Sequence, residues 1–364
     1  MKTRENRQGT FQQIRKALSK HVRAQSDNAV LVEGDSLHLL RNVPGKSISL
    51  ILTDPPYHST RKQNVHGDTS FADDQKYLDW MAQYISEWRR ILRDNGSIYC
   101  FCSSAMASRL EVLFRDRFNV LSQIVWTKPN DPGFDGWKQK MKKEALRQWY
   151  EHTERIIFAE PATEGNLFRS SLGKFLRDAR IECELSGHEL TKRIGAYGKV
   201  NHGGAVSNWE AGRNVPSREQ YRKICQAFIA TGKVKSLPAY EDVVRPFATD
   251  SSKEFTDVWN FPSVRPYKGK HPAEKPLSLL EHAIEATTYP GDIVLDCFAG
   301  SGCTQLAANN LGRRAISMEI DPHWVERIAS LFDKKAGRIT LSAVQKNRLG
   351  IKDNVLNQQP LFSE

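Results

Sequence analysis

The chain has 364 residues, 39% of them hydrophobic, which suits one large α/β domain with a buried core and a second, smaller domain. Its net charge of +11 is concentrated in residues 1–24 and 165–238, which suits a polyanionic partner or, equally, a solvated basic surface. No apolar run of about 18 residues, apolar leader or paired cysteine array occurs, which argues against a membrane span, a secretory signal and a metal centre.

Strands and helices alternate along the first 160 residues. Apolar runs that stop at Gly, Pro or Asp predict strands, and a 3.6-residue apolar period predicts helices. The expected elements are a basic, partly helical N-terminal arm at 1–28, strands at 29–34, 47–53 and 97–102, and helices at 36–42 and 77–92. This alternation implies a mostly parallel sheet covered by helices.

The pattern changes between residues 165 and 238, where expected helices at 172–184, 189–194 and 219–228 follow one another without a β-rich run. The α/β pattern then returns, with a helix at 277–287 and strands at 293–297 and 314–320. We therefore expect an inserted all-α domain at 165–238 between two halves of one α/β domain, 29–164 and 239–335, and a C-terminal tail at 336–364.

A glycine-rich turn follows the expected strand at 293–297. Gly300-Ser301-Gly302 leads into a helix from about Thr304, and glycines at such a turn let a ligand approach the backbone closely. Glu319 ends the next strand, where a carboxylate can accept the ribose hydroxyl protons of a nucleoside cofactor. A tight turn without a ligand is the alternative, and a nicotinamide cofactor is disfavoured because no third glycine follows Gly302 at the usual spacing.

The strand at 47–53 delivers Asp54-Pro55-Pro56-Tyr57 to the carboxyl edge of the sheet, where open α/β sheets bind ligands. The prolines stiffen the backbone and leave carbonyl oxygens as rigid acceptors. Two acceptors, Asp54 and the Pro55 carbonyl, would bind the hydrogens of an amine on an aromatic ring and expose its lone pair. Tyr57 offers a face on which an extruded base can stack. The alternative is a proline-rich turn with no chemistry.

These motifs, in this order, resemble the β group of DNA amino-methyltransferases. The resemblance rests on Asp54–Tyr57 upstream, on Phe298-Ala299-Gly300-Ser301-Gly302 downstream, and on the flanking stretches Gly34-Asp35, Asp257–Trp259, His271–Pro276 and Glu319–Asp321. It implies a Rossmann-like methyltransferase fold in which the catalytic half precedes the cofactor half, a circular permutation of the common order. Cys303, where the family often has Thr, departs from the pattern.

The resemblance also implies the cofactor, the substrate and the site residues. S-adenosylmethionine would be the methyl donor, and a base flipped out of duplex DNA the acceptor. Catalysis would fall to Asp54, Pro55, Pro56 and Tyr57, and Asp296 would hold the methionine ammonium unless it only bonds the loop amides. The implied cofactor-binding residues are Asp35, Asp54, Lys275, Asp296, Phe298, Ala299, Gly300, Ser301, Gly302, Glu319 and Asp321.

Three functions stay open. Asp before Pro-Pro-Tyr favours adenine N6 as the target, cytosine N4 has a similar amine, and a DNA-binding regulator on an inactive scaffold belongs to another class. The intact motifs argue against the inactive scaffold. The absence of any Pro-Cys dipeptide disfavours a cysteine nucleophile at cytosine C5.

The inserted segment resembles the phage-repressor helix-turn-helix in residues 172–180, 185–190 and 206–217, with Trp209 packing the third helix. The turn before that helix is enlarged, since 14 residues separate Gly195 from Trp209. A helical packing module without DNA contacts is the alternative. The expected DNA-binding residues are His202, Ser207, Asn208 and Arg213, with Lys199 on a phosphate, and Arg61 in the loop after Tyr57.

The C-terminal Gln358-Gln359-Pro360-Leu361-Phe362 resembles the peptide with which bacterial replication proteins dock on the sliding clamp, and self-packing of its apolar residues is the alternative. A monomer and a homodimer both stay open. The expected location is the cytoplasm, with bacterial or phage origin and association with the nucleoid.

Overall fold

The computed structural model describes residues 2–57, 71, 73–129, 147, 149, 151–163, 170–196, 204–248 and 255–332. Arg61, Lys199, His202 and the segment Gln358–Phe362 lie outside these residues, so their expected roles stay predictions. Among the described residues, no helix is long and apolar enough to cross a membrane.

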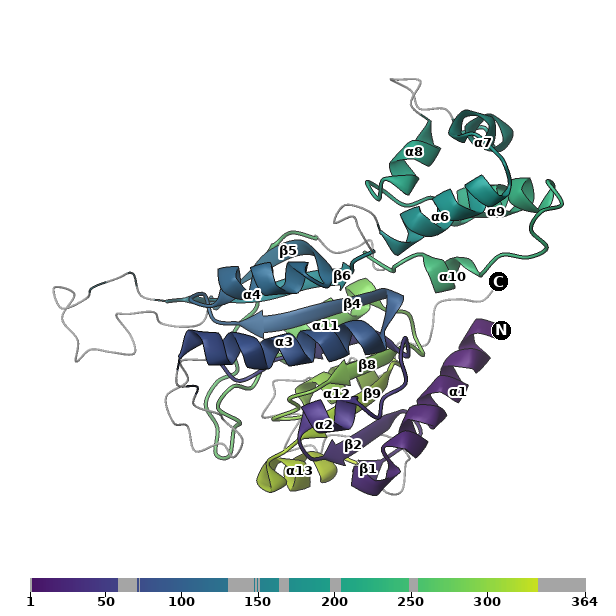
Figure 1. Ribbon diagram of the computed structural model, residues 1–364. Coiled ribbons are helices and arrows are strands. Elements are labelled where there is room, and N and C mark those ends of the chain that lie inside the picture. Colours follow the sequence, from purple (N-terminus) through teal and green to yellow (C-terminus); the bar gives the residue numbers. More distant parts are fainter. Residues whose placement is uncertain are drawn as a thin grey trace.

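The described strands form one sheet in the order β1-β2-β9-β8-β3-β4-β6-β5-β7 (Figure 1). The run from β2 through β9, β8 and β3 to β4 is parallel, whereas β1, β6 and β5 pair antiparallel with their neighbours β2, β4 and β6. The strands are β1 Val22–Gln25, β2 Ala29–Glu33, β3 Ile48–Thr53, β4 Leu92–Cys102, β5 Phe118–Thr127, β6 Thr153–Pro161, β7 Val258–Asn260, β8 Ile293–Asp296 and β9 Arg314–Glu319. The mostly parallel, Rossmann-like sheet expected from the sequence is confirmed.

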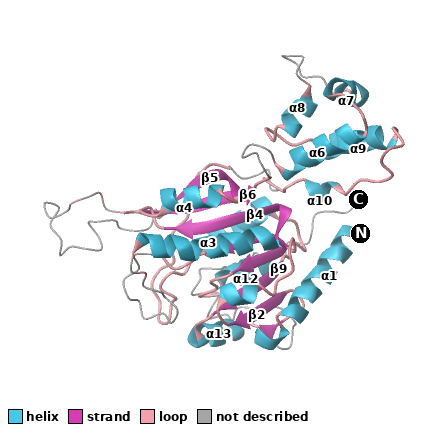
Figure 2. Ribbon diagram, viewed as in Figure 1, coloured by secondary structure: helices cyan, strands magenta, loops and turns pink. Residues whose placement is uncertain are grey.

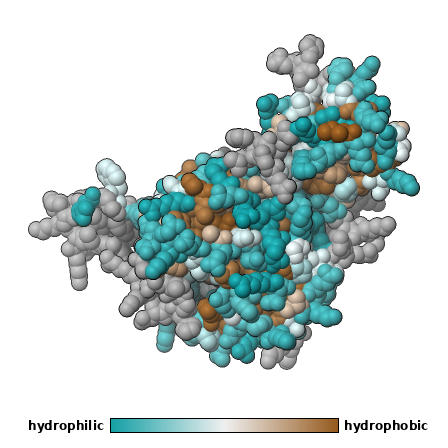
Figure 3. All heavy atoms as spheres, viewed as in Figure 1, coloured by the Kyte–Doolittle hydropathy of each residue, from teal (hydrophilic) through white to brown (hydrophobic). Residues whose placement is uncertain are grey.

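Helices cover both faces of this sheet, which explains why its central strands are apolar throughout rather than alternating. One face packs against α1 Lys2–Ala17, α2 Ser36–Leu40, α3 Asp74–Ile91 and α4 Ala107–Arg115. The other packs against α11 Leu277–Thr287, α12 Cys303–Asn310 and α13 Pro322–Ala329. Figure 2 shows the helices on the outside and the strands between them, and in Figure 3 most of the visible face is hydrophilic.

The N-terminal segment, expected as a basic arm at residues 1–28, contains a helix that packs against the sheet. Phe11, Ile14 and Leu18 are fully buried in the same core cluster as α3, and Arg7 forms a buried ion pair with Asp292 at 2.9 Å. A short 3-10 turn, Ser19–His21, then leads into β1 at the edge of the sheet. The apolar residues at i, i+3 and i+7 dock the helix although its other positions are basic or polar.

The described residues of the insert, 170–196 and 204–243, form helices, as expected, and have a core of their own. The helices are α6 Ser171–Glu182, α7 Gly187–Ile194, α8 Ala205–Glu210, α9 Arg218–Ile229 and α10 Tyr240–Val243. Ser186 and Ser217 begin α7 and α9 with capping boxes, and Trp209 is buried between the helices, as expected. Figure 1 shows α6 to α9 grouped to one side of the sheet.

The helical group is joined to the sheet near α10. Arg93 and Asn95 of β4 bind the Asp242 carboxylate at 3.1 Å and the Glu241 carbonyl at 2.9 Å. Beyond α10, Arg245 is paired with Glu160 of β6 at 2.7 Å. These polar contacts attach a module with a separate core to the base of β4 and to β6.

Candidate functional site

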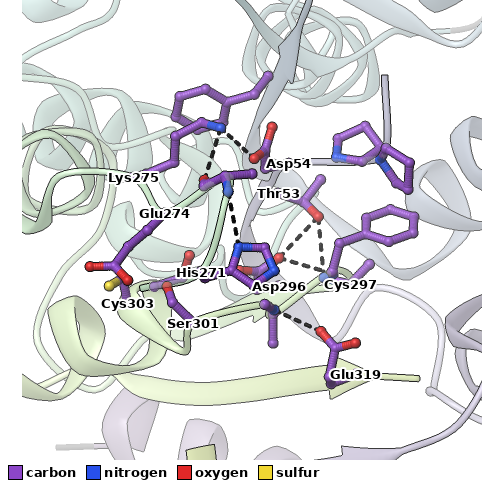
Figure 4. Close-up of a pocket in the computed structure, with 18 of the residues that line it drawn as sticks. Thr53, Asp54, His271, Glu274, Lys275, Asp296, Cys297, Ser301, Cys303 and Glu319 are labelled. Carbon is purple, nitrogen blue, oxygen red and sulfur yellow. Dashed lines mark hydrogen bonds and ion pairs between the residues drawn. The ribbon is translucent and has the colours of Figure 1, made fainter. Parts of the chain in front are cut away.

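A cavity of about 420 Å³ lies where the parallel strands β3 and β8 end. Pairing of Leu50 with Val294 puts the two strands in register, so Asp54 and Asp296 both emerge at the carboxyl edge of the sheet. The segment 263–275, which precedes α11, forms another wall of the same cavity. Two sequence motifs more than 240 residues apart therefore face one space (Figure 4).

Asp54 is held by a buried lysine. The Lys275 Nζ donates to Asp54 Oδ2 and also to the Ala273 carbonyl at 3.3 Å, while Asp54 Oδ1 is buried without a hydrogen-bond partner among the described residues. Burial raises the pKa of Asp54, and the ammonium of Lys275 counteracts this increase. One carboxylate oxygen is thus fixed, and the other is left as an acceptor in the cavity wall.

Glu154 of β6 connects this pair to the aromatic ring of the tetrapeptide. Its Oε2 accepts the Tyr57 hydroxyl at 2.8 Å, its Oε1 accepts Lys128 Nζ at 2.6 Å, and Lys275 Nζ lies 3.5 Å away. Burial disfavours the Glu154 carboxylate, but Lys275 and Lys128 outweigh burial and lower its pKa to about 2. Burial also raises the pKa of Tyr57, so its hydroxyl stays a donor.

The glycine-rich turn lines the cavity at Gly300, which lies against the His271 ring. Gly300 has φ +50° and donates its N–H to Glu319 Oε2 at 2.7 Å, which fixes the end of β9 against the turn. A Cβ atom at Gly300 would lie 3.0 Å from the His271 ring, so no larger residue fits without a shift. Glu319 also accepts two more backbone N–H groups, those of Ile320 and Asp321, at 2.9 Å each.

Asp296 bonds a loop amide, one of the two roles that the sequence left open, and it also lines the cavity. Its Oδ1 accepts the Phe298 N–H and the Thr53 hydroxyl, each at 3.1 Å, and the residue lines the cavity. Burial raises its pKa to about 6, although hydrogen bonds from Thr304, Phe298 and Thr53 favour the charged form. A carboxylate in this state would gain from a cationic partner in the cavity.

Aromatic rings form the wall next to this carboxylate. The Phe298 ring packs against Tyr84 and Trp80 of α3, with centroids 5.1 and 5.8 Å apart. Asp35 lies at the rim and begins α2 by accepting the N–H groups of Leu37 and His38. The cavity therefore offers an apolar surface flanked by acidic groups.

Most of the cofactor-binding and catalytic residues expected from the sequence line this one cavity, and two do not. Gly302 and Asp321 are outside the lining. Gly302 begins α12 at φ +79° facing Ile328, and Asp321 caps α13 by accepting the His323 N–H at 2.8 Å. Their geometry indicates a structural role at the starts of two helices.

The described DNA-binding candidates belong to the helical module and do not line this cavity. Ser207 and Asn208 are on α8, and Arg213 follows it and donates to the Asn208 side chain at 3.2 Å. Ser207 donates to the Gly204 carbonyl at 2.9 Å. Ser207 and Arg213 are exposed, and Asn208 is half-buried.

Sequence reasoning missed Glu154, Lys128 and Trp80 as cavity residues. Trp80 belongs to a helix that was predicted for its buried face alone. Glu154 lies directly opposite Trp126 in the antiparallel pairing of β5 and β6, a register that no local pattern reveals. The available signal was Lys128 directly after one strand and Glu154 at the start of the next.

The sequence and the fold both resemble known DNA methyltransferases. The chain is 26% identical over 310 residues to the DNA adenine methyltransferase YhdJ of Escherichia coli (strain K12), covering 84% of this chain and 83% of that protein. It is 25% identical over 331 residues to the type II methyltransferase M.PvuII of Proteus hauseri, covering 84% of each chain.

A solved structure described as a cytosine-N4-specific PvuII DNA methyltransferase superposes with a TM-score of 0.54 at 16% identity, over 90% of this chain and 95% of that one, which shows a shared fold. Residues 48–330 match the family model described as DNA methylase (N6_N4_Mtase). This match spans both sides of the cavity and the helical module between them, and the chain belongs to the N6/N4 DNA methylase family.

Proposed function

We propose that this DNA methyltransferase, whose methyl donor is S-adenosylmethionine, modifies the N6 amine of adenine in duplex DNA. The observation that carries the proposal is Asp54, a residue of the cavity wall beside Tyr57: Lys275 fixes one of its oxygens, and the other is buried without a hydrogen-bond partner among the described residues. That arrangement suits an amine whose hydrogens need acceptors in a fixed direction.

The residues present fit the cofactor. Gly300 lines the cavity without a side chain of its own, Glu319 at the end of β9 would bind the ribose hydroxyls, and Asp296 would hold the ammonium. Phe298 and Asp35 would contact the adenine portion from the aromatic wall and the rim. The bound cofactor supplies an electrophilic methyl group on a sulfonium.

The chain's own groups would then activate the base. Asp54 Oδ1 and the Pro55 carbonyl accept the two amine hydrogens, which draws the nitrogen lone pair out of conjugation and directs it into the cavity. Tyr57 provides a stacking face for the base, worth about 1–3 kcal/mol for base–aromatic stacking. Because a paired base cannot reach this buried edge, the mechanism requires base flipping.

The helical module is proposed to select the DNA sequence, with Ser207, Asn208 and Arg213 as the described candidates. Two features support this role: a core separate from that of the sheet, and exposed polar residues on α8 and in the turn after it. The order of the chain, with β3 and Asp54 before β8 and Gly300, supports the circular permutation implied by the motifs.

The target base is tested by mass spectrometry of DNA from cells that express the protein. N6-methyladenine that is absent from cells expressing Asp54→Ala would support the assignment. Detection of N4-methylcytosine alone would change the proposed target from adenine N6 to cytosine N4. The fold shared with the PvuII enzyme makes this a specific alternative. If neither methylated base is detected, the remaining function is that of a DNA-binding regulator on an inactive methyltransferase scaffold.

A further inference from the structure

We propose that Glu154 is a positioning residue that fixes the Tyr57 ring and the Asp54–Lys275 pair relative to each other. The role rests on the proposed function, because Asp54 and Tyr57 are the groups that would act on the base. Neither the motifs nor the family match assigns a role to a residue of β6.

The contacts of Glu154 link three polar side chains of the cavity wall, those of Tyr57, Lys128 and Lys275. One oxygen accepts the Tyr57 hydroxyl at 2.8 Å and lies 3.5 Å from Lys275, and the other accepts Lys128 at 2.6 Å. Lys275 in turn donates to Asp54, as Figure 4 shows. A single carboxylate therefore connects the stacking ring to the acceptor of the amine hydrogens.

The rigidity of the strand makes this link effective. Glu154 is on β6, where it pairs with Trp126 of β5, so its backbone is held in the sheet. Tyr57, by contrast, follows the end of β3 after two prolines, and its hydroxyl donates to Glu154. Tying the hydroxyl to a sheet residue removes rotation of the ring about its side-chain torsions.

Glu154 also balances the charge of the buried cluster around Asp54. Asp54, Glu154, Lys128 and Lys275 form two carboxylates and two ammonium groups, all with side chains at most 22% exposed. Removing one carboxylate leaves an uncompensated cation in a buried wall, and the remaining cations would rearrange around Asp54. Loss of Glu154 should therefore disturb both the ring and the acceptor without touching the glycine turn.

The test is a double-mutant cycle with Glu154→Ala, Tyr57→Phe and the double variant, each measured for kcat in methyl transfer and for S-adenosylmethionine affinity by calorimetry. Each single variant should lower kcat by about three- to tenfold, and the double variant should be no worse than Glu154→Ala alone, since both remove the same link. Cofactor affinity should change less than about twofold. Losses that multiply in the double variant would overturn the role.

A second readout does not depend on activity. With 3-fluorotyrosine at position 57, the ring should give one narrow fluorine resonance in the wild type and a shifted or broadened one in Glu154→Ala, with partial rescue in Glu154→Gln, which keeps an acceptor. An unchanged resonance would overturn the proposal. Absence of methyl transfer by the wild type would instead refute the proposed function, while the fluorine signal would still decide the role of Glu154.

Glu160 provides the matched control. It lies on the same strand, is also buried, and is paired with Arg245 at 2.7 Å outside the cavity. Glu160→Gln should lower the melting temperature and leave kcat and the fluorine resonance as in the wild type. A resonance in Glu160→Gln that shifts as far as in Glu154→Ala would mean that any buried charge on β6 has this effect, and would overturn the specific role.

Discussion

At the scale of single residues, the most direct prediction concerns Asp54. Asp54→Ala removes the acceptor and leaves Lys275 without its partner, so methyl transfer should fall by at least about 100-fold. Cofactor binding should persist, because Asp296, Gly300 and Glu319 form the other wall of the cavity. Tritium transfer to DNA measures the first effect and calorimetry the second. Transfer by Asp54→Ala at near the wild-type rate would contradict the assignment.

Gly300 tests the cofactor wall. Gly300→Val places a branched side chain at φ +50° and against the His271 ring, so affinity for S-adenosylmethionine should fall by more than about tenfold. Gly187 is the control, because a Cβ there meets nothing within 4 Å and its φ is not positive. Calorimetric titration of both variants decides the matter, and equal affinities would refute the placement.

The pKa of Asp296 predicts a pH dependence of cofactor binding. Burial raises this pKa to about 6, so the carboxyl takes up a proton as the pH falls through 6. An ammonium beside it favours the charged form, so binding near pH 6 should release a proton and affinity should decline below that pH. Calorimetry at pH 6 in buffers of different ionisation enthalpy would measure the release. None should occur near pH 8.

At the scale of elements, the helical module should be separable from the catalytic sheet. Replacing residues 168–236 with a short linker removes α6 to α9, whose core is distinct, while the sheet keeps all its described strands. The product should still bind cofactor but lose its preferred methylation motif, as single-molecule sequencing would reveal. In the intact protein, Asn208→Ala or Arg213→Ala should change site preference by about 1–3 kcal/mol. An unchanged motif after the deletion would locate recognition elsewhere.

The elements also show what a sequence can and cannot predict. Asp54 and Gly300 were found because each follows an apolar strand within a few residues, so local patterns place both at one edge of the sheet. Glu154 was not found, since its place depends on the antiparallel register of β5 with β6. The prediction of a basic arm rests on the many basic residues at the N-terminus, whereas the packing of α1 depends on three apolar residues at helical spacing.

At the scale of the whole molecule, substitutions in α1 test whether the basic N-terminal segment stabilises the fold or acts as a DNA-binding arm. Phe11 is fully buried, so Phe11→Ala should destabilise the fold by about 3–5 kcal/mol through the cavity it leaves. Lys16, which is exposed on the same helix, is the control, and Lys16→Ala should leave the melting temperature unchanged. Thermal unfolding measures both. If Phe11→Ala has normal stability but weakened DNA binding, the N-terminal segment acts as a DNA-binding arm.

The pairing of β3 with β8 and of β2 with β9 has a consequence for how the protein could be divided. Each pair joins strands from opposite sides of the helical module, so neither half of the chain contains a complete cavity. A break in the chain between α7 and α8 would yield two fragments, one holding Asp54 and the other holding Gly300 and Lys275. Each fragment would be inactive by itself, and methylation would return only when the two fragments associate. The methylated bases would then remain in the DNA as a covalent mark of that association.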